Sequence, residues 1–218
     1  MDNKAYEKAI KLYEKLEGRA AGTQLAQQAQ LEKAFAHFKN GEPVLAVSTL
    51  DRFIKVNPAS PALDYALYLK GIVNFNDDLG LLSFVAKQDL AERDQKAAKE
   101  SFEAFRELVT RFPESRYAED ARLRMRFTVN TLAQSEVKVA RYYLKRGAHV
   151  AAINRAQAVL QDYQDVPAAE DALNILIECY DALGLTQQRD DTRRVLAASF
   201  PPKASVNTEV KKPWWKPW

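Results

Sequence analysis

One spacing of small, large and turn residues occurs three times along this chain. A small residue is followed four and seven positions later by apolar residues, and then by a residue that ends the pattern. The three occurrences are Ala46, Leu50, Phe53 and Pro58; Ser101, Phe105, Leu108 and Pro113; and, more loosely, Ala152, Ala156, Val159 and Gln164. On a helix the first three positions share one face, and a proline ends the helix. The spacing is typical of the second helix of a helix–turn–helix repeat.

These repeats predict an all-α fold, a tetratricopeptide-type solenoid of helix hairpins with about five repeats. The predicted helices cover about 4–17, 24–39, 43–56, 60–75, 95–112, 115–134, 168–183 and 186–199, with a further repeat running from Val139 through Gly147 to Val159. Only seven glycines among 218 residues agree with a mostly helical chain. Stacked repeats of this kind bind other chains and seldom perform chemistry.

The predicted domain organisation is one solenoid over residues 1–202, with an N-terminal lobe of about 1–113 and a C-terminal lobe of about 114–202. An insertion at 76–94 interrupts the second full repeat. Either it carries partner contacts, or it is a loop whose apolar residues cover the neighbouring core. Residues 203–218 are predicted to be a disordered tail of lysine, proline and tryptophan. The tail suits a membrane interface or an acidic groove, or it is an extension beyond the fold.

Charge and chemistry-bearing residues narrow the function. The whole net charge of +3 falls on residues 203–218, so the remaining chain is neutral and unsuited to general nucleic-acid binding. His37 and His149 are the only histidines, and neither has a cysteine or histidine at metal-ligand spacing. No glycine-rich phosphate loop occurs, and Cys179 falls within a predicted helix as a small buried hydrophobe. We therefore expect no enzyme activity, no cofactor and no metal.

Two blocks of residues are more specific than the repeat spacing. The first comprises Asp51-Arg52-Phe53-Ile54, Asn57-Pro58, Pro61, Asp64-Tyr65, Tyr68 and Gly71; the second comprises Ala140, Tyr142-Tyr143, Lys145-Arg146-Gly147-Ala148, Val150-Ala151 and Asn154-Arg155. Arg93-Asp94 in the insertion also matches. With these residues the chain resembles the BamD (ComL) lipoproteins over nearly all of residues 4–200. These are tetratricopeptide subunits of the machinery that inserts β-barrel proteins into the outer membrane of Gram-negative bacteria.

The resemblance implies a non-enzymatic scaffold on the periplasmic face of the outer membrane, anchored by a lipidated N-terminal cysteine. The implied partners are BamA, other assembly lipoproteins and unfolded β-barrel proteins. We expect the signal peptide, the lipid cysteine and the first helix to lie outside this chain. The segment Arg19-Ala20-Ala21-Gly22 departs from the aromatic-Pro-aromatic character usual in the family. The alternative function is a generic tetratricopeptide adaptor in another periplasmic complex.

The resemblance also implies two binding surfaces. Arg155, supported by Arg146, His149 and Asn154, is expected to form an ion pair with a POTRA domain of BamA. The alternative for Arg155 is a salt bridge between repeats. Phe53, Asp64, Tyr65 and Tyr68 are expected to line a groove for the aromatic C-terminal strand of a barrel substrate, although packing between repeats also explains Phe53 and Tyr65.

Overall fold

A computed structural model of the chain describes residues 3–75, 88–163 and 165–201. Over these ranges it contains nine helices and no strand. The helices are α1 (Asn3–Arg19), α2 (Gln24–Lys39), α3 (Pro43–Val56), α4 (Leu63–Asn74), α5 (Gln88–Arg111), α6 (Ala118–Lys145), α7 (His149–Asp162), α8 (Ala168–Ala182) and α9 (Thr186–Ser199). The predicted all-α fold is confirmed.

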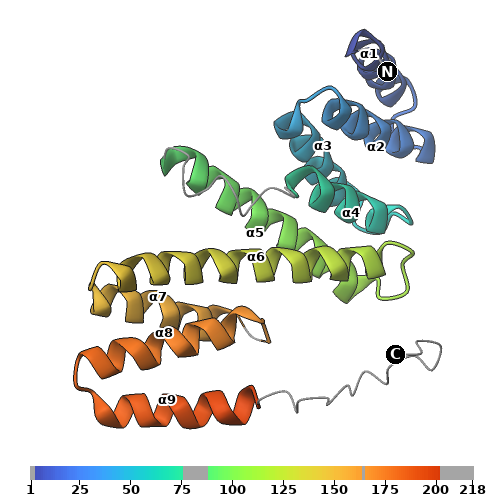
Figure 1. The fold of residues 1–218 in the computed structure, drawn as a ribbon. Helices are drawn as coiled ribbons and strands as arrows, with labels where there is room; N and C mark the ends of the chain where they lie inside the picture. The colour runs from blue at the N-terminus through green and yellow to red at the C-terminus, as the bar shows by residue number, and fades with distance from the viewer. Residues whose placement is uncertain (1–2, 76–87, 164, 202–218) are drawn as a thin grey trace, which may run out of the picture. The chain divides into compact units, whose positions relative to one another are not determined.

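Successive helices pack as hairpins within two compact units (Figure 1). In unit 1, residues 1–132, each of the first four helices contacts the next one. In unit 2, residues 133–218, α7 contacts α8 and α8 contacts α9. The boundary falls inside α6, whereas the sequence predicts two lobes that meet near residue 113. The single-solenoid organisation stays a prediction.

The repeat spacing correctly predicts the interior of both units. The small and large apolar positions of all three occurrences are 0% exposed: Ala46, Leu50, Phe53, Ser101, Phe105, Leu108, Ala152, Ala156 and Val159. In unit 1 the apolar ones among these residues belong to a core that α4 completes with Leu63 and Leu67. Proline follows shortly after the last helical residue of α3 and of α5, as the spacing predicts.

A close approach of α4 and α5 explains why one core position is glycine. A Cβ atom built on Gly71 would lie 2.4 Å from Cε1 of Phe105, which is itself fully buried. The hydroxyl of Ser101 donates a hydrogen bond of 2.8 Å to the Gly71 carbonyl oxygen. The small residues therefore let the helices meet, and the buried hydroxyl is paired.

Two predicted boundaries are wrong. Helix α5 begins at Gln88 rather than near residue 95, so the end of the predicted insertion is helical, while residues 76–87 lie outside the described residues. Helix α6 continues to Lys145 rather than ending near Gln134. Neither stretch contains glycine or proline, so nothing in the backbone interrupts the helix.

The predicted tail at 203–218 also lies outside the described residues, so its disorder stays a prediction. Among the helices that the structure describes, none is both long enough and apolar enough to span a membrane.

Candidate functional site

A pocket of about 620 Å³ lies in unit 1 between α2, α4 and the loop that precedes α6. Its lining residues are Gln24, Gln27, Gln28, Leu31, Glu32, Ser60, Pro61, Ala62, Asp64, Tyr65, Arg116 and Tyr117. Thr23 fixes the start of α2, because its hydroxyl oxygen accepts a hydrogen bond of 3.3 Å from the Ala26 backbone N–H. The wall from α2 is mainly polar amides, and the opposite wall is aromatic.

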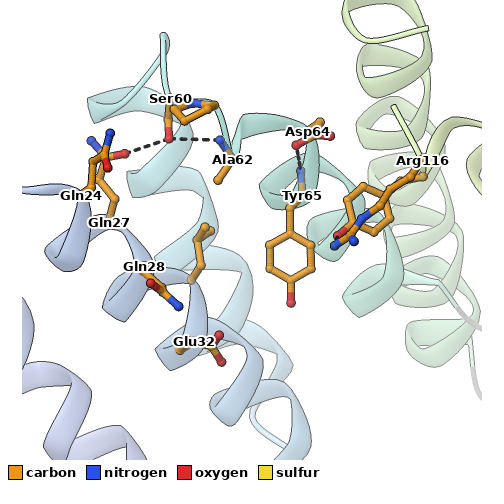
Figure 2. A pocket seen from close by; sticks show the side chains of 12 residues that line it. Gln24, Gln27, Gln28, Glu32, Ser60, Ala62, Asp64, Tyr65 and Arg116 are labelled. Atoms are coloured by element: carbon orange, nitrogen blue, oxygen red, sulfur yellow. Dashed lines mark hydrogen bonds between the residues drawn. The ribbon is translucent and has the colours of Figure 1, made fainter. Parts of the chain in front are cut away.

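Tyr65 is the central side chain of this pocket. Figure 2 shows its ring between α2, which carries Gln28 and Glu32, and Arg116 on the far side. Burial, followed by the neighbouring Glu32 carboxylate, raises the pKa of the Tyr65 phenol above its ordinary value. The phenol therefore stays neutral near pH 7 and offers one donor, one acceptor and a ring face.

Arg116 and Tyr117 form the aromatic wall opposite α2. The guanidinium carbon of Arg116 lies 4.7 Å from the centre of the Tyr117 ring, and an Arg116 N–H also donates to the Tyr117 hydroxyl. The Tyr117 ring lies 5.7 Å from the Tyr65 ring, measured between centroids. Arg116 is exposed and makes no salt bridge with any residue in the described ranges. Its positive charge is available to a ligand.

Serine side chains in two equivalent loops hold this pocket together. Ser60 donates a hydrogen bond of 2.8 Å to Oε1 of Gln27 on α2 (Figure 2), and Ser115 donates one of 2.7 Å to Oδ2 of Asp64 on α4. Each serine oxygen also accepts a hydrogen bond of 3.3 Å from the backbone N–H two residues later. Both loops therefore bind back to the first helix of the preceding repeat, and this pairing places Tyr65 and Arg116 at one recess.

Of the four predicted groove residues, Asp64 and Tyr65 line the pocket and the other two do not. Phe53 is fully buried in the core, so its packing role accounts for it. Tyr68 supports the aromatic wall from behind: its ring stacks on Tyr117 at 4.6 Å, and its hydroxyl donates a hydrogen bond of 2.8 Å to Asp120.

Asp120 accepts hydrogen bonds from both Tyr68 and the cationic side chain of Arg124. Burial of Asp120 works to raise its pKa, but the hydrogen bonds from Arg124, at 2.7 Å, and from Tyr68 outweigh it and lower the pKa below the ordinary value. Asp120 is therefore ionised near pH 7 and holds the Tyr68 hydroxyl in a charge-assisted hydrogen bond.

Sequence reasoning missed Arg116, Tyr117 and the glutamines of α2. A signal for them exists, because Pro58-Ala59-Ser60 and Pro113-Glu114-Ser115 share one pattern at equivalent repeat ends. The pattern identifies two similar loops. It does not show that Arg116 reaches across to the face of α2, which depends on the stacking of the repeats.

The second predicted surface lies in unit 2. Arg155 and Asn154 are exposed on α7, and Nη1 of Arg155 lies 3.2 Å from Oε2 of Glu136 on α6. Half of the Arg155 side chain remains exposed, against 23% for Glu136. This salt bridge joins α6 and α7, which are the two helices of one hairpin, and it leaves one side of the guanidinium open.

Arg146 and His149 flank the same turn between α6 and α7. The Arg146 guanidinium lies 4.6 Å from the centre of the Tyr142 ring, which is 38% exposed. Nδ1 of the half-buried His149 is shielded from solvent and has no hydrogen-bond partner among the described residues. The turn therefore presents arginines and an aromatic ring.

The remaining candidates for chemistry are metal ligands and Cys179. Within the described residues no three histidine, cysteine or acidic side chains group closely enough to hold a metal ion. Cys179 is 0% exposed, and burial raises the pKa of its thiol, so it is an unreactive core residue as predicted.

Comparison with known proteins agrees with this architecture. The family model described as YfiO, outer membrane lipoprotein, matches residues 1–196. The chain belongs to the YfiO family of outer membrane lipoproteins. Like the assembly factors it is related to, this YfiO-family chain is not an enzyme.

Relatives of this YfiO-family chain include proteins named outer membrane protein assembly factor BamD. The relative from Neisseria meningitidis (strain Z2491) is 45% identical over an alignment of 222 residues, which covers 100% of this chain and 83% of the relative. The relative from Vibrio cholerae is 35% identical over 188 residues, covering 86% of this chain and 78% of its own length. The relative from Pasteurella multocida is 32% identical over 213 residues, covering 98% and 81%.

Proposed function

We propose that this protein is a scaffold for outer membrane protein assembly, located at the outer membrane on its periplasmic face. The family assignment and the shared name of the relatives support the assembly role and the outer membrane location. The face of the membrane follows from the expected position of a lipid-anchored assembly subunit. The protein acts by holding an unfolded substrate and a folded partner on separate surfaces.

The pocket around Tyr65 receives the C-terminal strand of an unfolded barrel protein. The observation that supports this most is the pairing of a half-buried tyrosine with an exposed arginine that lacks a salt bridge within the described ranges. A terminal aromatic side chain can stack against Tyr65 and Tyr117. Its carboxylate can accept two hydrogen bonds from the planar fork of Arg116.

Unit 2 docks on the POTRA domain of BamA through Arg155. The open side of the Arg155 guanidinium can take a carboxylate of the partner while Glu136 holds the other side. Arg146, His149 and Asn154 surround this contact. Other assembly lipoproteins are expected to join the same complex.

Binding of a labelled peptide tests the pocket. The probe is a fluorescent peptide of about ten residues that ends in phenylalanine, in a free-acid and an amidated form, titrated by anisotropy. We expect Tyr65→Ala to weaken binding of both forms about tenfold. Arg116→Gln weakens only the free acid, by about fivefold or more.

Two controls limit the interpretation of this titration. Arg126→Gln removes another exposed arginine outside the pocket and leaves both affinities unchanged. Circular dichroism confirms that each variant keeps its helicity. Equal affinities of wild type, Tyr65→Ala and Arg116→Gln for the free acid exclude the pocket as the peptide site.

A further inference from the structure

A second pocket, of about 480 Å³, lies in unit 1 where the ends of α1 and α3 meet the side of α2. Its lining residues come from Glu14 to Thr23, from Ala26 to Lys33 on α2, and from Arg52 to Asn57 at the end of α3. Nothing in the proposed function uses this pocket.

Gln30 is the notable residue of this second pocket. It is only 7% exposed, and its carboxamide makes no hydrogen bond with any of the described residues. Neither polar atom of this amide is among the buried atoms that lack a partner, so the amide is open to the pocket. A ligand in the pocket can therefore accept a hydrogen bond from the Gln30 carboxamide and donate one to it.

The charges around Gln30 are already compensated. Glu17 accepts a hydrogen bond of 2.7 Å from Lys33 and another of 2.6 Å from Arg52, so one carboxylate pairs with both cations. Glu14 brings the lining to a formal charge of zero. A neutral wall without a free cation selects against phosphate and carboxylate ligands.

The lining also lacks an aromatic side chain, so it offers no platform for a sugar ring or a nucleobase. What it offers are the side-chain amides of Gln27, Gln30 and Asn57, together with Val56, which is 68% exposed. Side-chain amides match the alternating N–H and C=O groups of an extended main chain. An uncharged peptide segment fits this chemistry.

Gln27 connects this pocket with the pocket around Tyr65. It lines both pockets, and its carboxamide oxygen accepts a hydrogen bond from Ser60, which lines the pocket around Tyr65. A strand rises by about 3.3 Å per residue, so a peptide that enters at Tyr65 needs only a few more residues to continue past Gln27.

We propose that the second pocket binds the main chain of the same extended peptide, upstream of its C-terminal residue, through the Gln30 carboxamide. This inference rests on the proposed peptide site at Tyr65 and extends it. The pocket around Tyr65 binds the C-terminal residue of the peptide, and the second pocket binds an uncharged extended segment of its backbone. Substrates with a charged segment at that place bind only through their C-terminal residues.

Two peptides of different length test the inference on the whole chain. The short peptide has about six residues and the long one about twelve, and an extended strand rises by about 3.3 Å per residue. Both peptides share the same C-terminal residues and end in phenylalanine. The long peptide carries an uncharged extension. We expect wild type to bind the long peptide about tenfold more tightly than the short one, as about one or two net hydrogen bonds provide.

Two variants identify the pocket as the source of that gain. Gln30→Met keeps the length of the side chain and removes the amide, and Val56→Arg places a long charged side chain at the exposed rim. Both should reduce the affinity for the long peptide to that for the short one, and neither should change binding of the short peptide. Because Val56 is exposed, its replacement does not disturb the core.

Matched controls are available in the same chain. Val44→Arg is the control for Val56→Arg: Val44 lies at the other end of α3, is 79% exposed and lies outside both pockets. Gln187→Met on α9 is the control for Gln30→Met. Both should retain the tenfold gain. Equal binding of the two peptides to wild type, or a gain that survives Gln30→Met and Val56→Arg, overturns the inference. Failure of the short peptide to respond to Tyr65→Ala instead overturns the proposed site at Tyr65, and the inference with it.

Discussion

The two candidate surfaces are built in different ways. In unit 1 the residues around the pocket fix one another: Tyr68 stacks on Tyr117, and Ser115 binds Asp64 across the repeat. In unit 2 Arg155 stands on an exposed helix face and has one partner, Glu136, at 3.2 Å. One surface is a recess with a prepared wall, and the other is a half-exposed cation.

This difference indicates what each surface can bind. A flexible peptide loses conformational entropy on binding, so a recess with fixed aromatic side chains lowers the further cost of ordering the site. A folded partner brings its own fixed geometry, so an exposed arginine that can turn toward a carboxylate is sufficient. The substitutions below test this contrast, starting with the largest expected effect.

Phe53→Ala and Tyr65→Ala separate core from groove inside unit 1. Phe53 is fully buried, so its truncation should lower the free energy of unfolding by about 3–5 kcal/mol. Tyr65 is only half-buried, and its truncation should cost clearly less stability while weakening peptide binding about tenfold. Urea denaturation and the peptide titration measure the two quantities. A similar loss of stability for both variants would show that Tyr65 belongs to the core.

Arg155→Glu tests the exposed cation of unit 2. Reversing the charge should weaken binding to a purified POTRA domain of BamA about thirtyfold or more, because an interface ion pair becomes a repulsion. Calorimetry measures the affinity, and circular dichroism monitors helicity. Glu136→Gln is the second variant to measure, because it removes the salt-bridge partner of Arg155 and keeps the arginine. If Arg155 serves only the salt bridge between α6 and α7, Glu136→Gln and Arg155→Gln destabilise the fold equally and neither changes partner binding.

The sequence predicted the buried face better than it predicted the site. Burial at Leu50, Phe105 and Val159 follows from helical periodicity, which is a local property of the chain. Arg116 reaches the pocket only because the loop after α5 binds back to Asp64 on α4. That contact depends on the stacking of repeats, so no local pattern contains it.

The wrong end of α6 has a related cause. Val139, Ala140 and Tyr143 occupy the places expected for the first helix of a new repeat, and the periodicity alone does not show whether a helix restarts or continues. Without glycine or proline between Ala118 and Lys145, the helix continues. Phe53 was predicted to line the groove but is fully buried in the core. It lies in a motif that carries the family resemblance, and membership of that motif does not distinguish a core residue from its exposed neighbours.

Removing one tyrosine hydroxyl in each unit sharpens the comparison further. Tyr68 donates to the ionised Asp120 at 2.8 Å in unit 1, whereas the Tyr180 hydroxyl in unit 2 accepts from the neutral amide of Gln157 at 3.1 Å. Hydrogen bonds to charged groups contribute more, so Tyr68→Phe should cost about 1.5 kcal/mol and Tyr180→Phe about 0.5–1 kcal/mol. Urea denaturation at neutral pH gives both values. Equal costs would show that the Asp120 carboxylate adds nothing to the wall.

The smallest expected effect is a loss of stability at alkaline pH. Burial raises the pKa of Tyr65 and of Tyr68 above 10.0, and Asp120 raises that of Tyr68 further. In the unfolded chain these phenols ionise near pH 10, while in the folded chain they hold their protons longer. Their contribution to stability is therefore complete below about pH 10 and is lost as the pH rises through the raised pKa values.

Urea midpoints between about pH 8 and pH 11.5 measure this loss, with tyrosinate absorbance as the direct readout of ionisation. The double variant Tyr65→Phe, Tyr68→Phe should be less stable at neutral pH but flatter across this range. In unit 2, burial and Glu136 also raise the pKa of Tyr163, so Tyr163→Phe is the matched control. If Tyr163→Phe flattens the curve as much as the double variant does, the alkaline sensitivity belongs to buried tyrosines in general. If only the double variant flattens the curve, the alkaline sensitivity belongs to Tyr65 and Tyr68 at the pocket of unit 1.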